Sequence, residues 1–210
     1  MTNHAILDFE TLGQDVNSCP IIDCSYVVFE WERFTSNNPY TVHELLKLIK
    51  KSKLDITSQV KKHKFVVEQS SVDWWKEQGA EAREKIKPRP DDVSLEDFME
   101  SFLSYFEDQR VKYWWSRANT YDPMILARCA SLLGLKQRMD KCLPYWAVRD
   151  TRTFIDAKFN FNSSTSFCPI QDTERWDRVF VKHSSTHDIM ADILRLQALV
   201  RVENDMELPE

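Results

Sequence analysis

Two carboxylates stand two residues apart near the start of the chain, in the sequence ILDFETLG. Asp8 and Glu10 end a short apolar segment, and residues two apart on a β-strand point to the same side of it, about 7 Å apart. Because crowded carboxylates are costly unless a cation neutralises them, this pair predicts a site for a divalent cation. Two further D-x-E pairs, at residues 172–174 and 205–207, lie in a loop and a tail. The motif alone therefore leaves a chance origin open.

A third carboxylate, Asp122, stands where a predicted strand at residues 111–118 meets a predicted helix at residues 123–133. An Asp followed by Pro is a common helix start, so Asp122 could act as an N-cap without any chemistry. Ligands of α/β proteins also gather at strand ends, where this side chain would be displayed. Both interpretations of Asp122 stay open on the sequence alone.

Histidine and aspartate recur at one spacing in the sequence KHSSTHDIMADIL. His187 lies five residues before Asp192, and His183 lies five residues before Asp188, so either pair could have arisen by chance. We favour His187 and Asp192, because the carboxylate then falls inside the last predicted helix and the imidazole lies at its first turn. Asp188 is explained as a first-turn carboxylate that the helix dipole favours.

Strands followed by alternating helices and strands predict an α/β or α+β domain with a mixed sheet. The β-formers and the apolar periodicity predict strands at residues 5–9, 20–31, 111–118 and 146–150, and helices at residues 72–86, from 95 onward, 123–133, 151–157 and 187–202. Ser94 is the expected N-cap of the second helix. Residues 160–181 are expected to form a long loop with room for a short strand.

The composition limits the class of protein. The chain has 210 residues, 42% of them apolar, which predicts one folded domain at residues 1–202 followed by an acidic, frayed tail at 203–210. Five cysteines without a C-x-x-C pair predict reduced thiols and neither a disulfide framework nor a zinc site. The absence of a leader and of any apolar run of ~18 residues predicts an intracellular protein with no membrane contact.

The charge of the chain bears on its partners. A net charge of −5 argues against binding nucleic acid by bulk electrostatics alone, but not against holding phosphate through metal ions. Residues 45–64 carry seven lysines. This pattern favours a solvated surface, and an arm that follows the phosphates of the upstream strand stays open as the alternative. Trp74 and Trp75 are expected in the core and at its rim rather than as a platform for bases, because adjacent residues cannot share a helix face.

The order D-x-E, D, H-x4-D resembles the DEDDh group of 3′–5′ exonucleases, which have the ribonuclease H-like fold, a mixed β-sheet flanked by helices. Residues 74–88, 116–126, 146–157 and 183–194 also resemble stretches of phage members of this group. The resemblance implies that Asp8, Glu10, Asp122 and Asp192 hold two Mg²⁺ or Mn²⁺ ions and that His187 is the general base. Oxygen ligands are the right type for such cations.

The resemblance also suggests substrate contacts and marks departures. Thr11 resembles the residue whose backbone contacts the terminal nucleotide, and Leu12 the residue that packs against its base. The group commonly has Ala two residues after the histidine, where this chain has Ile189, so the orientation of His187 is in question. Asp150 corresponds to a helix-start element, and we interpret it as structural.

The activity that the resemblance implies is a 3′–5′ exodeoxyribonuclease, which releases nucleoside 5′-monophosphates from single-stranded DNA in the cytoplasm of a phage host. A 3′–5′ exoribonuclease of the same fold is the nearest alternative, since nothing in the sequence selects against a 2′-hydroxyl. A silent nucleic-acid-binding or polymerase-associated subunit would require loss of a ligand, and all five positions are filled. An endonuclease with the same sheet would not need His187. The oligomeric state stays open.

Overall fold

Five strands form one mixed sheet in the computed structural model, which describes residues 2–78, 80–161 and 164–208. Their spatial order is β3-β2-β1-β4-β5. The strands are β1 (Asn3–Thr11), β2 (Ile21–Glu30), β3 (Lys50–Lys53), β4 (Tyr113–Ser116) and β5 (Val148–Asp150). β1, β2 and β3 pair antiparallel, whereas β4 and β5 run parallel to β1. The predicted α/β fold with a mixed sheet is confirmed.

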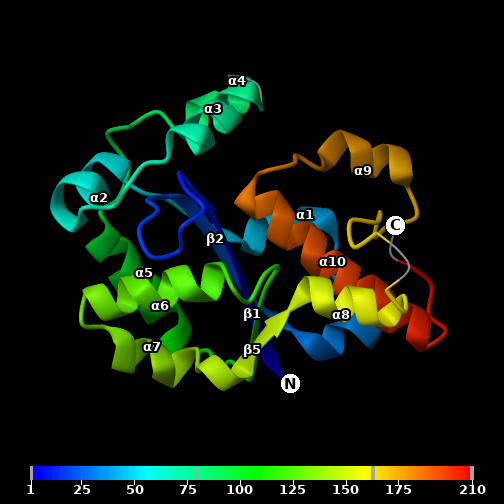
Figure 1. The fold of residues 1–210 in the computed structure, drawn as a ribbon. Coiled ribbons are helices and arrows are strands. Elements are labelled where there is room, and N and C mark those ends of the chain that lie inside the picture. The colour runs from blue at the N-terminus through cyan, green and yellow to red at the C-terminus, as the bar shows by residue number, and fades with distance from the viewer. Residues whose placement is uncertain (1, 79, 162–163, 209–210) are drawn as a thin grey trace.

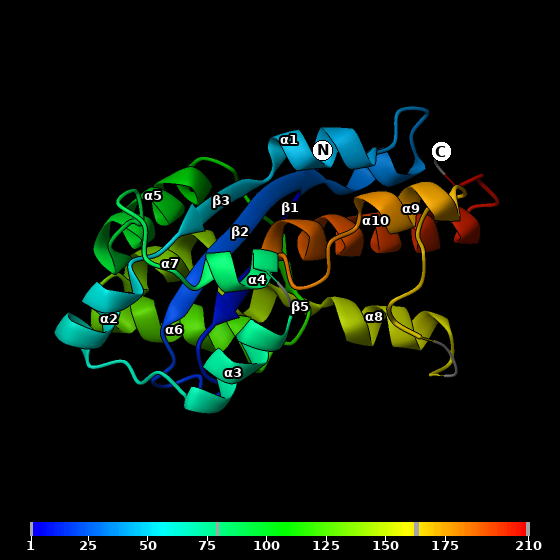
Figure 2. The ribbon, with the colours of Figure 1, turned by 90° about the horizontal axis from the view of Figure 1, so that it is seen from above.

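Alternation along β1 decides which residues face which helices. Ala5, Leu7 and Phe9 pack with one layer of helices: α5 (Leu95–Glu107), α6 (Asp122–Leu132) and α7 (Lys136–Cys142). Ile6 packs on the other face, with α1 (Val42–Leu48) and α10 (Ser185–Glu203). Figures 1 and 2 show the two layers on opposite sides of the sheet. Since side chains alternate, the even-numbered acids of β1 point to the α10 side.

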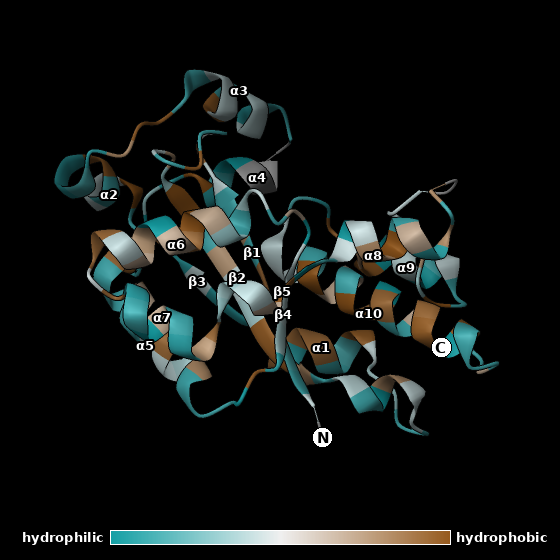
Figure 3. Ribbon diagram, turned by 60° about the horizontal axis from the view of Figure 1, so that its bottom comes forward, coloured by the Kyte–Doolittle hydropathy of each residue, from teal (hydrophilic) through white to brown (hydrophobic). Residues whose placement is uncertain are grey.

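The remaining helices surround this core. They are α2 (Ile56–His63), α3 (Gln69–Glu77), α4 (Ala80–Lys85), α8 (Thr151–Lys158) and α9 (Thr173–Val179). Short 3-10 turns cover Trp31–Thr35 and Tyr145–Ala147. Hydrophobic residues concentrate on the central strands and on the inner turns of α6 and α10 (Figure 3). None of the helices in the described part of the chain combines the length and apolar character that a membrane crossing requires.

Most predicted elements are confirmed, with four differences. The Ser94 hydroxyl caps α5 by accepting the Asp97 N–H at 3.1 Å, as expected. The helix predicted over residues 72–86 is instead two short helices, α3 and α4. The loop predicted over 160–181 contains a helix, α9, instead of a strand. Residues 45–64 contain the last residues of α1, the whole of β3 and the whole of α2. Helix α7 was not predicted, because its seven residues make too few turns to show a clear helical period.

The cysteines and the C-terminal tail were also subjects of prediction. All five cysteines lie in the described part of the chain and are free thiols there. The tail is not wholly frayed, because the Glu207 carbonyl accepts a hydrogen bond from Arg201 Nε at 2.6 Å. Residues 209–210 lie outside the described residues.

Candidate active site

Three carboxylates from two elements converge beside the end of β1. Asp8, Glu10 and Asp188 each offer an oxygen, and these atoms lie within 4.8 Å of one another. Asp8 and Glu10 share a face of β1, and Asp188 comes from the first turn of α10, which packs on that face. The D-x-E pair is therefore placed as predicted, whereas Asp188 was assigned a structural role. Three carboxylates at this spacing suit a divalent cation.

Asp122 reaches the same place from β4. Because β4 runs parallel beside β1, the chain leaving it delivers Asp122 next to Phe9, whose N–H donates to the Asp122 carboxylate at 3.2 Å. Asp122 is only 4% exposed. The N-cap position belongs to Tyr121, and no side chain caps α6 there. The N-cap interpretation of Asp122 is thus wrong, and its carboxylate faces the other acids.

Asp192 lies one helical turn after Asp188 and is 2% exposed. One of its oxygens accepts from Arg117 and from Arg195, the latter at 3.1 Å, and the other accepts from the Thr151 hydroxyl at 2.6 Å. Two guanidinium groups therefore neutralise a carboxylate that is almost wholly buried. Asp192 is near enough to act electrostatically on both Asp8 and Asp122.

Burial and mutual repulsion make these acids hard to ionise. Burial, reinforced by Asp122 and Glu10, raises the pKa of Asp8 well above its ordinary value. Burial is also the first cause for the other acids, raising the pKa of Glu10 to about 8, that of Asp122 to about 7 and that of Asp188 to about 6. A bound cation would remove this cost by neutralising the carboxylates.

The two candidate histidines have different surroundings. His187 Nδ1 accepts the Val181 N–H at 3.3 Å. His183, which has a left-handed backbone with φ of 57°, lines a hollow of about 590 Å³ together with Arg117, Asp188 and Asp192. Burial, helped by nearby lysines, lowers the pKa of His183. The structure thus places His183 and not His187 along this hollow.

A polar network fixes the start of α10 on the sheet. The Ser185 hydroxyl donates to Asp23, which is 1% exposed and pairs with Lys51 at 2.9 Å. The Ser25 hydroxyl shares hydrogen bonds with Ser185 at 2.7 Å and with Thr186 at 2.9 Å. Because Asp23 stands opposite Glu10 in the β1–β2 pairing, this network holds α10 against the acids.

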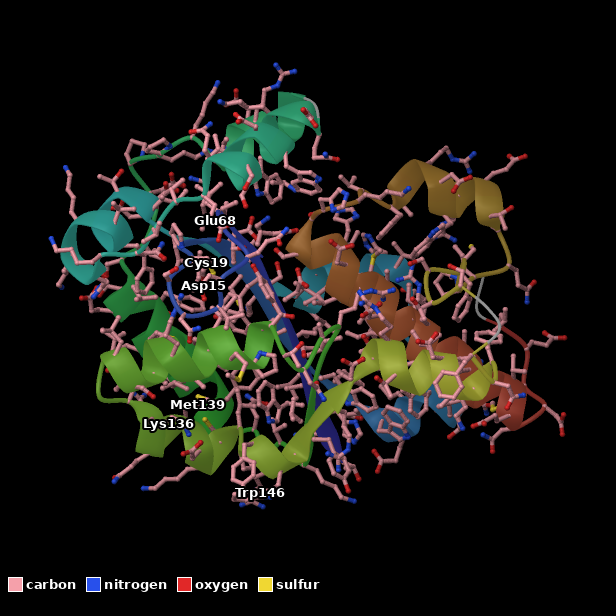
Figure 4. The ribbon with its side chains drawn as sticks, viewed as in Figure 1. Asp15, Cys19, Glu68, Lys136, Met139 and Trp146 are labelled. Atoms are coloured by element: carbon pink, nitrogen blue, oxygen red, sulfur yellow. The ribbon has the colours of Figure 1, made fainter. Side chains whose placement is uncertain are left out.

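Residues that follow the D-x-E pair line a second hollow beside the acids. Thr11 lines a hollow of about 440 Å³ with Glu10 and Tyr121, and the Thr11 and Tyr121 hydroxyls share a hydrogen bond of 2.6 Å. Leu12, by contrast, is 4% exposed and packs in the core. The loop that follows is held by Glu68, whose carboxylate accepts the N–H groups of residues 14 and 15 at 2.9 and 3.2 Å (Figure 4).

The geometry agrees with comparisons to known proteins. Residues 3–190 match the family model of the 3′–5′ exoribonuclease Rv2179c-like domain. The chain belongs to this family. It is 30% identical to an exodeoxyribonuclease of Enterobacteria phage T4 over 219 aligned positions, which cover 96% of this chain and 91% of that protein. This confirms the predicted resemblance to 3′–5′ exonucleases and to their phage members.

Solved exonuclease I structures share the fold of this Rv2179c-like domain. One from Methylocaldum szegediense gives a TM-score of 0.62 at 11% identity, covering 98% of this chain and 41% of that one. Exonuclease I of E. coli in complex with an oligonucleotide gives 0.61 at 12% identity, covering 96% and 41%. The chain therefore spans less than half the length of these structures, and at this identity they establish the fold alone.

Three residues of the candidate site were not predicted from the sequence. The sequence explains Asp188 as a first-turn carboxylate of the helix. Arg117 and Asp23 have no signal in the sequence, because single charged residues on strands and strand ends are common. The spacing of Asp188 to Asp192 contained the missing information, since residues four apart lie on one helix face. Asp150 is confirmed as structural: it caps α8 by accepting the Thr153 N–H at 2.8 Å.

Proposed function

We propose that the chain is a divalent-metal-dependent 3′–5′ exodeoxyribonuclease that removes nucleoside 5′-monophosphates from the 3′ end of single-stranded DNA. The observation that carries this proposal is the convergence of Asp8, Glu10 and Asp188, joined by Asp122, at the end of β1. The phage relative is named for action on DNA, and related folds are solved with DNA oligonucleotides. The cytoplasm of a phage host is the matching place of action.

The donor set fits two hard cations, Mg²⁺ or Mn²⁺. Asp8, Glu10, Asp122 and Asp192 would hold them, with Asp188 as a neighbouring carboxylate that the structure adds to the set. Such a pair supplies a nucleophilic hydroxide near neutral pH and offsets the charge that builds on the phosphate. Arg117 and Arg195 both donate to one oxygen of Asp192, so these two arginines would compete with a cation for that oxygen.

His187 would accept the proton of the attacking water. Its Nδ1 already accepts the Val181 N–H, so Nδ1 can take a proton only after the segment at Val181 moves away. Replacing His187 by Asn is expected to lower kcat by about 10²-fold or more. His183→Asn, the matched control, should keep kcat and change only substrate binding. A loss of kcat with His183→Asn alone would assign the base to the earlier histidine.

The decisive experiment uses 5′-labelled oligonucleotides of one sequence, as single-stranded DNA and as RNA, with Mg²⁺, Mn²⁺ or EDTA. We expect a ladder that shortens from the 3′ end, faster on DNA, and no product in EDTA. Faster shortening of RNA would support an exoribonuclease, which the description of the matching family favours. Intact DNA and RNA with folded protein in every metal would overturn the proposal and support a binding role.

A further inference from the structure

Two neighbouring tryptophans of α3 have opposite surroundings. Trp75 is 2% exposed, packs with Leu12 and Ile22, and donates from Nε1 to the Thr11 carbonyl at 3.0 Å. Trp74 is 40% exposed. Because Trp75 ties α3 to the residue that follows the D-x-E pair, the position of Trp74 relative to Glu10 is fixed. The exposed indole lines the 440 Å³ hollow beside Glu10.

Trp74 contacts His183, which lines the other hollow, the one that contains Asp188. The two rings touch edge to face, with centroids 4.8 Å apart and planes at 82°. Lys85, at the end of α4, donates from Nζ to the His183 carbonyl at 2.6 Å. The aromatic pair therefore joins the hollow that contains Glu10 to the hollow that contains Asp188, next to the carboxylates that would hold metal.

We infer that Trp74 and His183 form an aromatic gate that stacks on a base of the single strand whose 3′ end enters the acid site. This inference rests on the proposed function and names the group that selects a single strand. Aromatic rings bind bases of any sequence by stacking, and basic residues beside them attract the phosphates. Lys85 and Lys182 supply such charge next to His183. A paired base in a duplex is stacked on its neighbours and has to be unpaired before it reaches Trp74.

The first test measures binding without turnover. The anisotropy of a 5′-fluorescein oligothymidylate is followed in EDTA for wild type, Trp74→Ala, Trp74→Phe and His183→Ala. We expect ~10-fold weaker binding for Trp74→Ala and recovery to within about threefold for Trp74→Phe, because the phenyl ring still stacks. The matched control is Trp146→Ala, which changes an indole that is 67% exposed at the opposite end of the molecule (Figure 4) and should bind as wild type.

The second test measures KM and kcat on the same oligonucleotide with Mn²⁺, and competition by a blunt duplex. Trp74→Ala should raise KM about as much as it weakens binding, with a smaller change in kcat. The gate would be overturned if Trp74→Ala and His183→Ala bind the oligonucleotide as tightly as the control Trp146→Ala. It would also be overturned if a blunt duplex competes for wild-type protein as well as a single strand does. If Trp74→Ala does not fold, Trp74→Phe and His183→Ala decide. A wild type that binds but never cuts would overturn the proposed function and leave the binding test of the gate valid.

Discussion

Asp8 has four other carboxylates near enough to act on it electrostatically, from β1, α6 and α10. Such a cluster destabilises the folded chain unless protons or cations neutralise it, because like charges in a poorly solvated site repel strongly. The protein keeps this cost at the cluster of carboxylates for which we propose cation binding. The repulsion therefore points to function rather than to stability.

Replacing Asp8 by Asn tests this directly. We expect the variant to lose activity by about 10³-fold or more, since one of the carboxylates that would hold the cations is gone. In EDTA its free energy of unfolding should rise by about 1 kcal/mol or more, because burial no longer opposes a charge. Urea unfolding and the oligonucleotide assay measure the two effects. The exposed Asp91→Asn is the control, and an Asp8→Asn protein less stable than wild type would contradict the repulsion.

The sequence could predict this site only in part. The D-x-E pair was clear because an apolar strand surrounds it, whereas His187–Asp192 and His183–Asp188 have the same spacing. The spacing of the histidine and aspartate residues shows which face of α10 they share, but not how far α10 extends into the site. The hydrogen bond between Ser185 and Asp23, which are 162 residues apart in the sequence, fixes that position. A contact of this range has no local signature.

Among the helices and strands, the sequence predicted those features that depend on a single segment of the chain. Ser94 and the apolar stripe of α5 are confirmed, because a cap and a helical period are properties of one segment. The order of the strands in the sheet is not a property of one segment. No short stretch of sequence indicates that β1 lies between β2 and β4. The short helices α7 and α9 were missed because each makes about two turns, too few for a clear period.

The network that holds α10 makes an element-scale prediction. Ser185→Ala leaves the buried Asp23 with one partner fewer, so the free energy of unfolding should fall by about 1–3 kcal/mol. The start of α10 then moves more freely, and kcat should fall although no catalytic group is changed. Thermal unfolding and kcat on single-stranded DNA measure this, with Ser131→Ala, at an exposed position near the end of α6, as control. Unchanged kcat and stability together would show that the network does not position α10.

At the scale of the whole molecule, three of the seven lysines of residues 45–64 form ion pairs with acids of the same chain. Lys51 pairs with Asp23, Lys53 with Asp92 at 2.7 Å, and Lys62 with Glu96. These pairs favour the solvated interpretation of the segment over a phosphate-binding arm. The triple variant Lys47→Ala, Lys50→Ala, Lys61→Ala should therefore change KM for single-stranded DNA by less than about twofold at ~0.15 M salt. A tenfold rise in KM, together with a weaker dependence of KM on salt, would support the interpretation of residues 45–64 as a phosphate-binding arm.

The acid site also sets how the stability of the whole chain depends on pH. Glu10, Asp122 and Asp188 have pKa values of about 8, 7 and 6 in the folded protein, against about 4 when unfolded. The folded state thus binds more protons than the unfolded state between these values, and stability falls as pH rises.

In EDTA the melting temperature should be highest near pH 5 and fall steadily toward pH 8, as the three acids are forced to ionise. Saturating Mn²⁺ should remove most of this fall, because the cations stabilise the ionised carboxylates and bind only the folded chain. Melting curves at pH 5, 6, 7 and 8, with and without Mn²⁺, measure both effects. The Asp8→Asn variant is the control, and its slope with pH should be shallower. A melting temperature in EDTA that rises from pH 5 to pH 8 would mean that these carboxylates are not crowded in solution.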